Sequence, residues 1–194
     1  MKDPEIRAHV LMSLATILIA TSFPVGAAIT HSLDPLVLTL LRFSVAALLF
    51  GPIVALRYGL SWPGWRALAG YAVISACLVG FFWGMFAALR LTSVLNTATI
   101  FTLIPAITAA FSAMILRERL QPVAGLALSV GLVGAVWVVF RGNLDAFLAL
   151  DLGKGDGIFL AACFGMAAYS PILKRLHRGE PMPVVTFWTF VTGV

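Results

Sequence analysis

Six long, almost uncharged apolar runs constrain the fold of this chain more than any other feature of its sequence. Each is long enough for a helix to cross the hydrocarbon core of a bilayer, which is roughly 30 Å thick and takes about 20 helical residues. Strands of a membrane barrel would be about 10 residues long with strict apolar–polar alternation, and Val123–Val139 shows none. The runs predict an all-α membrane protein, a polytopic helical bundle with six complete transmembrane helices in contact with the lipid bilayer. They cover His9–Ile29, Pro35–Leu56, Trp65–Leu89, Ser93–Leu116, Pro122–Phe140 and Gly157–Leu173.

The composition supports this class and excludes two others. Apolar residues make up 61% of the chain and charged residues 11%, whereas soluble domains have about 45–50% and about 25%. The mean hydropathy is +1.02. Because a soluble chain of this length needs many more charged residues to cover its surface, soluble globular and disordered classes are excluded.

The basic residues indicate topology rather than a nucleic-acid partner. Thirteen Lys and Arg against eight Asp and Glu give a net charge of +5, but they lie singly or in threes at the ends of the apolar runs and not on one aromatic-rich face. With the amino terminus inside, nine fall on the inner side, three, Arg90, Arg141 and Lys154, fall on the outer side, and Arg42 lies inside the second run. This bias predicts a multi-pass protein of the cytoplasmic (inner) membrane with a cytoplasmic amino terminus. The nine are Lys2, Arg7, Arg57, Arg66, Arg117, Arg119, Lys174, Arg175 and Arg178.

A seventh apolar run begins near Pro183 and stops at Val194, after about 12 residues or roughly 18 Å of helix. It is too short to span, so we expect a truncated seventh helix and a chain that is a fragment of a longer one. The loops are short except for residues 142–156, a hydrophilic stretch that predicts a linker. A weak repeat crosses this linker, since Phe23-Pro24 before Asp34-Pro35 resembles Tyr169-Ser170-Pro171 before Glu180-Pro181. The similarity is explained either by chance or by duplication of a five-helix unit, which would invert the second copy.

The chain contains no recognisable catalytic constellation. It lacks His-Glu-x-x-His, a Gly-x-Ser-x-Gly elbow and a Walker phosphate loop. Cys77 and Cys163 lie in separate runs without a second Cys or His at ligand spacing. We therefore predict that the protein is not an enzyme and requires no metal or other cofactor. No carboxylate lies in the core of a run, which disfavours simple proton coupling through a carboxylate in this portion.

Prolines within the apolar runs indicate possible breaks around a solute pathway. Pro24, Pro52, Pro105 and Pro171 each free a backbone carbonyl and bend a helix. Such breaks expose polar backbone to a cavity in transporters, but they also serve as simple packing kinks. Ser22 and Phe23 adjoin one break, and Tyr169 and Ser170 adjoin another, which favours the cavity interpretation.

Four further residues have two interpretations each. Arg42 lies inside the second run, where it either faces the bundle, to anchor a neighbouring helix or meet an anionic group of a substrate, or extends its side chain to the interface. Asn96 and Thr99 share a helix face and either line a pathway or bond neighbouring helices. Trp83 is either an interface anchor or a cavity residue.

Loose motifs along essentially the whole chain form a recognisable pattern. They lie at Gly125, Gly131 and Gly134 and in the segments Ser22-Phe23-Pro24, Asp34-Pro35, Leu41-Arg42-Phe43, Ala88-Leu89-Arg90-Leu91-Thr92-Ser93, Leu103-Ile104-Pro105, Arg117-Glu118-Arg119-Leu120, Gly155-Asp156 and Phe164–Pro171. With these motifs the sequence resembles the EamA-like family of the drug/metabolite transporter superfamily. The resemblance implies a 5+5 inverted-repeat fold, with residues 1–141 as the first five-helix repeat, 142–156 as the linker and 157–194 as the start of the second repeat. It also implies that Glu118 acts as a gate or a topology anchor, although a solvated charge cluster is an equal alternative.

Together these features predict a secondary transporter of the exporter type that moves small organic solutes by alternating access. Its partners would be the solute, the lipid bilayer, and the remaining helices of the second repeat or a second copy of the chain. The alternative is a non-transporting membrane assembly protein or an inactive transporter fragment. The predicted pathway residues are Ser22, Phe23, Pro24, Arg42, Trp83, Asn96, Thr99, Pro105, Tyr169 and Ser170, with Glu118 as the gate.

Overall fold

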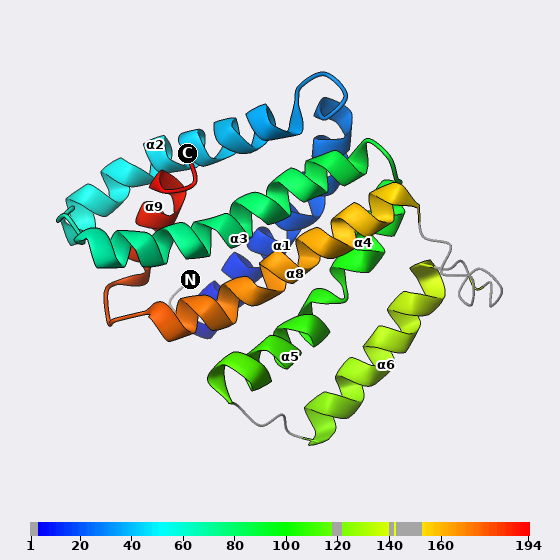
Figure 1. The fold of residues 1–194 in the computed structure, drawn as a ribbon. Coiled ribbons are helices and arrows are strands. Elements are labelled where there is room, and N and C mark those ends of the chain that lie inside the picture. The colour runs from blue at the N-terminus through cyan, green and yellow to red at the C-terminus, as the bar shows by residue number, and fades with distance from the viewer. Residues whose placement is uncertain (1–3, 118–121, 140–141, 143–152) are drawn as a thin grey trace.

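The computed structural model describes residues 4–117, 122–139, 142 and 153–194, and these residues form helices and short connections with no strand among them. Figure 1 shows the helices as a bundle in which segments far apart in the sequence lie side by side. The elements are α1 (Pro4–Ile29), α2 (Pro35–Tyr58), α3 (Trp65–Leu89), α4 (Val94–Phe101), α5 (Ile104–Leu116), α6 (Pro122–Val139), α8 (Lys154–Leu176) and α9 (Met182–Val191).

The helical membrane bundle predicted from the sequence is confirmed. Among the described residues, five segments are long and apolar enough to cross a membrane, namely Ala8–Ile29, Pro35–Tyr58, Trp65–Leu89, Val94–Leu116 and Lys154–Leu176. The apolar helices Pro122–Val138 and Met182–Val191 are shorter. They correspond to the predicted fifth span and to the predicted incomplete seventh span.

Helices α3 and α8 form the centre of the bundle and pack along much of their lengths. Small residues allow this close approach. A Cβ atom built on Gly84 of α3 would lie 2.5 Å from the Cβ of Ala162, and one built on Gly165 of α8 would lie 3.0 Å from the carbonyl oxygen of Cys77. Because a lipid-exposed bundle gains little from apolar burial alone, such close van der Waals packing is a main source of its cohesion.

An aromatic core covers one end of the α3–α8 contact. Phe23 of α1 is 5% exposed, and its ring packs edge-on against Phe101 and Phe159, with centroids 5.4 and 6.1 Å away. Phe81 of α3 lies 5.9 Å from both of those rings. Edge-to-face pairs of this kind contribute about 0.5–1.5 kcal/mol each beyond burial. The core therefore holds α1, α3, α4 and α8 together.

The predicted fourth span is two helices instead of one. α4 ends at Phe101, and the amides of Thr102 and Leu103 donate to the carbonyls of Thr99 and Ile100 at 3.0 Å before α5 begins. Pro105 occupies the first turn of α5, where its missing N–H is tolerated, whereas in a continuous helix its ring would collide with the preceding turn. The break predicted at this proline is thus a complete interruption of the helix.

The predicted linker is shorter at its carboxyl end than the sequence suggested. α8 begins at Lys154, three residues before Gly157, and Gly155 and Asp156 are buried in its first turn. A Cβ on Gly155 would lie 2.9 Å from the Cβ atoms of Leu91 and Thr92. An acidic residue in the first turn is favoured by the helix dipole. The glycine and the acidic residue therefore belong to a closely packed helix start, although the composition of this stretch predicted a loop.

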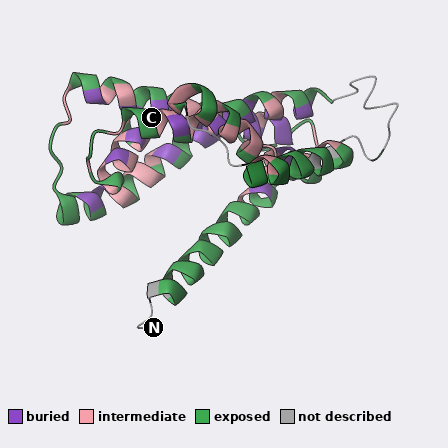
Figure 2. Ribbon diagram, turned by 90° about the horizontal axis from the view of Figure 1, so that it is seen from below, coloured by how far each residue is buried: buried purple, intermediate pink, exposed green. Residues whose placement is uncertain are grey.

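Helix α1 stands apart from the rest of the bundle. Figure 2 shows it extending away from the other helices, exposed along most of its length. Its carboxyl end is the attached part, because the Thr30 hydroxyl donates to the Phe86 carbonyl at 2.9 Å and Nε of Arg90 donates to the Thr30 carbonyl at 2.7 Å. The exposed remainder is apolar, with Leu14, Ile17 and Leu18 more than half exposed, as expected of a helix surrounded by lipid.

Candidate functional site

A cavity of about 340 Å³ lies among α2, α3, α8 and α9. Cavities of this size are typical of sites for small organic molecules. The wall is mainly apolar and aromatic, with one charged side chain and three hydroxyl groups. Its lining residues are Arg42, Phe43, Ala46, Leu78, Phe82, Met166, Tyr169, Thr186, Thr189 and Phe190.

Arg42 carries the charge of the cavity. Its guanidinium carbon lies 4.1 Å from the centroid of the Phe82 ring on α3, in a cation–π contact. Within the described residues it has no carboxylate partner. Its side chain is exposed in the described structure and contacts a ring of the neighbouring helix α3, and the bundle-facing role made from the sequence stays a prediction.

Aromatic rings form a fixed frame around Arg42. Phe43 is 2% exposed and packs edge-on against Phe82 and Phe190, with centroids 6.1 and 5.9 Å away. Phe50, two turns further along α2, reaches the same Phe190 ring at 6.3 Å. These contacts connect α2 to α3 and α9, so the wall that faces a solute is held by packing between helices.

The three hydroxyl groups of the cavity differ in whether they already donate a hydrogen bond within the protein. Thr186 and Thr189 donate to the carbonyls of Met182 and Val185, one turn back in α9, at 2.9 and 2.8 Å. The phenol of Tyr169 is partly buried and makes no hydrogen bond to any described residue. Tyr169 is thus the hydroxyl of this cavity that is free to bond a solute.

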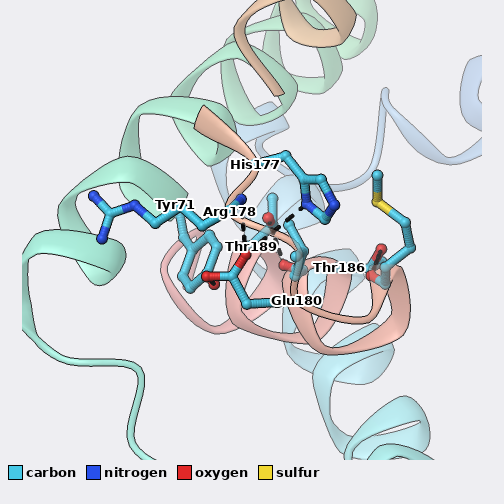
Figure 3. Close-up of polar contacts among 8 residues, drawn as sticks. Tyr71, His177, Arg178, Glu180, Thr186 and Thr189 are labelled. Carbon is cyan, nitrogen blue, oxygen red and sulfur yellow. Dashed lines mark hydrogen bonds and ion pairs between the residues drawn. The ribbon is translucent and has the colours of Figure 1, made fainter. Parts of the chain in front are cut away.

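A polar cluster lies beside the cavity, where α8 connects to α9. Figure 3 shows Glu180 placed between Tyr71, His177 and the backbone of Arg178. Its carboxylate accepts from the Arg178 amide at 2.9 Å and from the Tyr71 hydroxyl at 3.4 Å, and lies 3.9 Å from Nδ1 of His177. Partial burial would raise the pKa of Glu180, but these hydrogen bonds and the nearby histidine lower it overall. The cluster joins α3 to the α8–α9 connection.

A second polar cluster lies where α8 begins, and its acidic member was not predicted. Asp156 is 7% exposed, accepts a short hydrogen bond from the Thr92 hydroxyl, and lies 3.3 and 3.4 Å from Nδ2 of Asn96. The sequence placed Asp156 in a hydrophilic linker, because three aspartates and several glycines occur together there. The four-residue spacing of Thr92 and Asn96 was the available signal, since it puts both on one face next to any helix that packs there.

The structure distributes the predicted pathway residues over several places. Arg42 and Tyr169 meet at the cavity, Phe23 belongs to the aromatic core, and Asn96 belongs to the Asp156 cluster. The hydroxyls of Ser22 and Thr99 donate to carbonyls of their own helices, those of Ile19 and Leu95.

The other predicted positions lie at the surface or outside the described residues. Trp83 is 46% exposed, and its role as an interface anchor or a cavity residue stays a prediction. Pro24, Pro105 and Ser170 are exposed on the described surface. Glu118 lies outside the described residues. Sequence reasoning did not find Phe43, Thr186, Thr189 or Phe190, because their convergence depends on contacts between α2 and α9.

The long apolar helices and the amphipathic cavity between them define a helical, multi-pass membrane protein with a site suited to a small solute. The chain belongs to the EamA-like transporter family, whose model matches residues 6–140, and the resemblance seen in the sequence is thereby confirmed. It is also 27% identical over 155 residues to a protein of Bacillus subtilis (strain 168) described as uncharacterized transporter YyaM. That alignment covers 78% of this chain and 50% of the relative, so the chain spans about half the length of the curated relative it matches. No solved structure gives a significant match.

Proposed function

We propose that this chain forms the first part of a secondary transporter that moves small organic solutes across the cytoplasmic membrane, outward, by alternating access. The observation that carries the proposal is the cavity in which Arg42 and Tyr169 meet among four helices. Membership of the EamA-like transporter family supports it. The remaining helices of a second repeat, or a second copy of the chain, would complete the pathway, with residues 1–141 and 157–194 belonging to successive repeats.

The chemistry of the cavity suits an organic solute better than a bare ion. An ion that crosses a membrane needs several oxygen ligands or a ring of charges along its route. The aromatic and aliphatic wall with a few polar groups instead matches the general composition of small-molecule sites. The predicted positions outside the cavity, including Ser22, Asn96 and Thr99, remain pathway candidates for another conformation of the complete protein.

Solute flux in the complete protein tests this proposal. We expect Tyr169→Ala to change the rate or the solute preference of transport in proteoliposomes, since it removes a hydroxyl and a ring from the cavity wall. Phe164→Ala is the matched control, because Phe164 lies on the same helix, is 47% exposed and packs on Phe111 of α5. Asn96→Ala and Phe23→Ala extend the test to the other predicted positions.

Two outcomes would contradict the proposal. One is a complete protein that reconstitutes in the correct orientation and shows no flux with a broad panel of organic solutes, which would favour an assembly role. The other is wild-type flux with wild-type selectivity in the Tyr169, Asn96 and Phe23 variants, which would remove all three residues from the pathway.

A further inference from the structure

We propose that the cavity among α2, α3, α8 and α9 selects organic anions, with Arg42 binding the anionic end group and the aromatic wall receiving the apolar body. The inference rests on the proposed function, because anion selection affects transport only if the protein is a transporter. Binding of the anion itself can be measured without transport. Its basis is the pairing of an uncompensated guanidinium with rings and one free phenol in a single cavity.

The position of Arg42 leaves its hydrogen-bond donors available. A guanidinium is planar and carries five N–H donors that point outward in its plane. The guanidinium carbon lies 4.1 Å from the centroid of the Phe82 ring, and none of the Arg42 N–H groups donates a hydrogen bond to a described residue, so the edge of the group is available. The edge is the part that binds a carboxylate or phosphate through two parallel hydrogen bonds.

The electrostatic balance of the cavity favours an anion. The lining residues include one cation and no carboxylate, and no ion pair to Arg42 occurs in the described part of the chain. A charge placed within a membrane protein is costly unless it is paired or solvated. An anionic solute would supply that pair, and a cationic solute would add like charge.

The alternative role of Arg42 is to extend toward the lipid–water interface. The contact with Phe82 argues against it, because this contact directs the guanidinium across to α3 within the bundle. The ring frame of Phe43 and Phe190 packs beside it, so the charge is held where a solute in the cavity would meet it.

The rest of the wall specifies the body of the solute. Phe43, Phe82 and Phe190 offer ring faces and edges, and Leu78 and Met166 add aliphatic surface. The free Tyr169 hydroxyl provides one further donor or acceptor. These features suit an aromatic or similarly flat apolar body attached to one anionic group.

Three probes that share a phenyl ring and a three-carbon chain test the inference on the complete protein in detergent. They are phenylpropionate, phenylpropanol and phenylpropylamine, which are anionic, neutral and cationic at neutral pH. We expect phenylpropionate to bind most tightly in equilibrium dialysis. Arg42→Gln should weaken its binding roughly tenfold or more, about 1.4 kcal/mol, and should leave phenylpropanol nearly unchanged.

Two further variants separate charge from folding. Arg42→Lys keeps the charge but not the paired donors, so it should retain the preference for the anion at reduced affinity, and it remains informative if Arg42→Gln fails to fold. Arg57→Gln is the matched control, because Arg57 is a basic residue of the same helix that is exposed and lies outside the cavity. It should bind all three probes as the wild type does.

Equal binding of the three probes by the wild type, or no binding of phenylpropionate at millimolar concentration, would overturn the inference. So would an unchanged anion preference in a folded Arg42→Gln protein. These results are distinct from failure of the proposed function. A wild-type protein that transports anionic, neutral and cationic solutes at similar rates would keep the transporter and remove anion selection.

Discussion

Arg42 and Asp156 show how far single residues can be interpreted from sequence. Arg42 was recognisable as a pathway candidate because a charge within an apolar run is costly and needs a reason, and it does line the cavity. Asp156 was not recognisable, since a carboxylate among glycines and other aspartates is normally solvated. Its burial depends on Thr92 and Asn96, which come from a segment about 60 residues earlier. Such partners become visible only in the folded chain.

Glu180→Gln is expected to lower the melting temperature at neutral pH and to have less effect as the pH falls. Partial burial opposes ionisation, but hydrogen bonds from the backbone amides, then from Tyr71, and the charge of His177 lower the pKa of Glu180 overall. A carboxyl group with a lowered folded-state pKa contributes stability above its unfolded-state pKa of about 4.3. That contribution is lost as the pH falls through the lowered value.

The measurement is the melting temperature of wild type and Glu180→Gln in the same detergent, from about pH 7.5 to about pH 3.5. The gap between the two proteins should be widest at the neutral end and should close at the acid end. A gap that stays constant over this range would mean that the ionised carboxylate is not what stabilises the α8–α9 connection.

At the scale of elements, the apolar runs predicted the existence of the helices better than their continuity. Hydropathy is averaged over a whole run, so Val94–Leu116 looked like one span although it contains the break between α4 and α5. A proline can kink a helix or end it, and the sequence does not distinguish these outcomes. Helix α8 helps to hold α5 in its separate position, because Nη1 of Arg175 on α8 donates to the Ile115 carbonyl at the end of α5. The arrangement of α5 therefore depends on α8.

The contact between α3 and α8 gives a prediction with an internal control. Gly84→Ala is expected to destabilise the protein by about 1–3 kcal/mol, since the new Cβ would lie 2.5 Å from the Cβ of Ala162 and would push the two helices apart. Gly80→Ala lies one turn earlier on α3, where a Cβ meets nothing within 4 Å. It should be neutral or stabilise by up to about 1 kcal/mol, because alanine is the better helix former.

Reversible unfolding of both variants in mixed micelles measures these effects. Similar stability of Gly84→Ala and Gly80→Ala would show that the α3–α8 contact yields easily. It would also argue against close packing of small residues as the main cohesion at the centre of the bundle.

At the scale of the whole molecule, the charge bias predicts an amino terminus in the cytoplasm. Ser32 lies between α1 and α2, and Ser61 lies between α2 and α3, and both are exposed. In a chain made free of other cysteines, Ser32→Cys should react with a membrane-impermeant maleimide added to intact cells. Ser61→Cys should react only after the cells are opened. Exclusive labelling of Ser61→Cys from outside would reverse the orientation.

The class of the molecule followed from the sequence because hydropathy and charge act residue by residue and add up along the chain. The cavity could not be predicted from the sequence, because it depends on which helices become neighbours. α9 lies beside α2, although Phe190 and Phe43 are separated by most of the chain. Their ring contact is a property of tertiary packing, which no local pattern in either segment records.

The separate position of α1 has a consequence for how the protein is made. Chains are synthesised from the amino terminus, so α1 enters the membrane before α3, α4 and α8, the helices it contacts, exist. Three of its hydroxyl groups need no neighbouring helix during that interval, since those of Thr16, Thr21 and Ser22 donate to carbonyls of α1 itself. A nascent α1 therefore satisfies these three hydroxyls within its own helix before its neighbours are present. Its docking through Phe23 and Thr30 is then a later event, which follows the insertion of the helices that carry Phe86, Phe101 and Phe159.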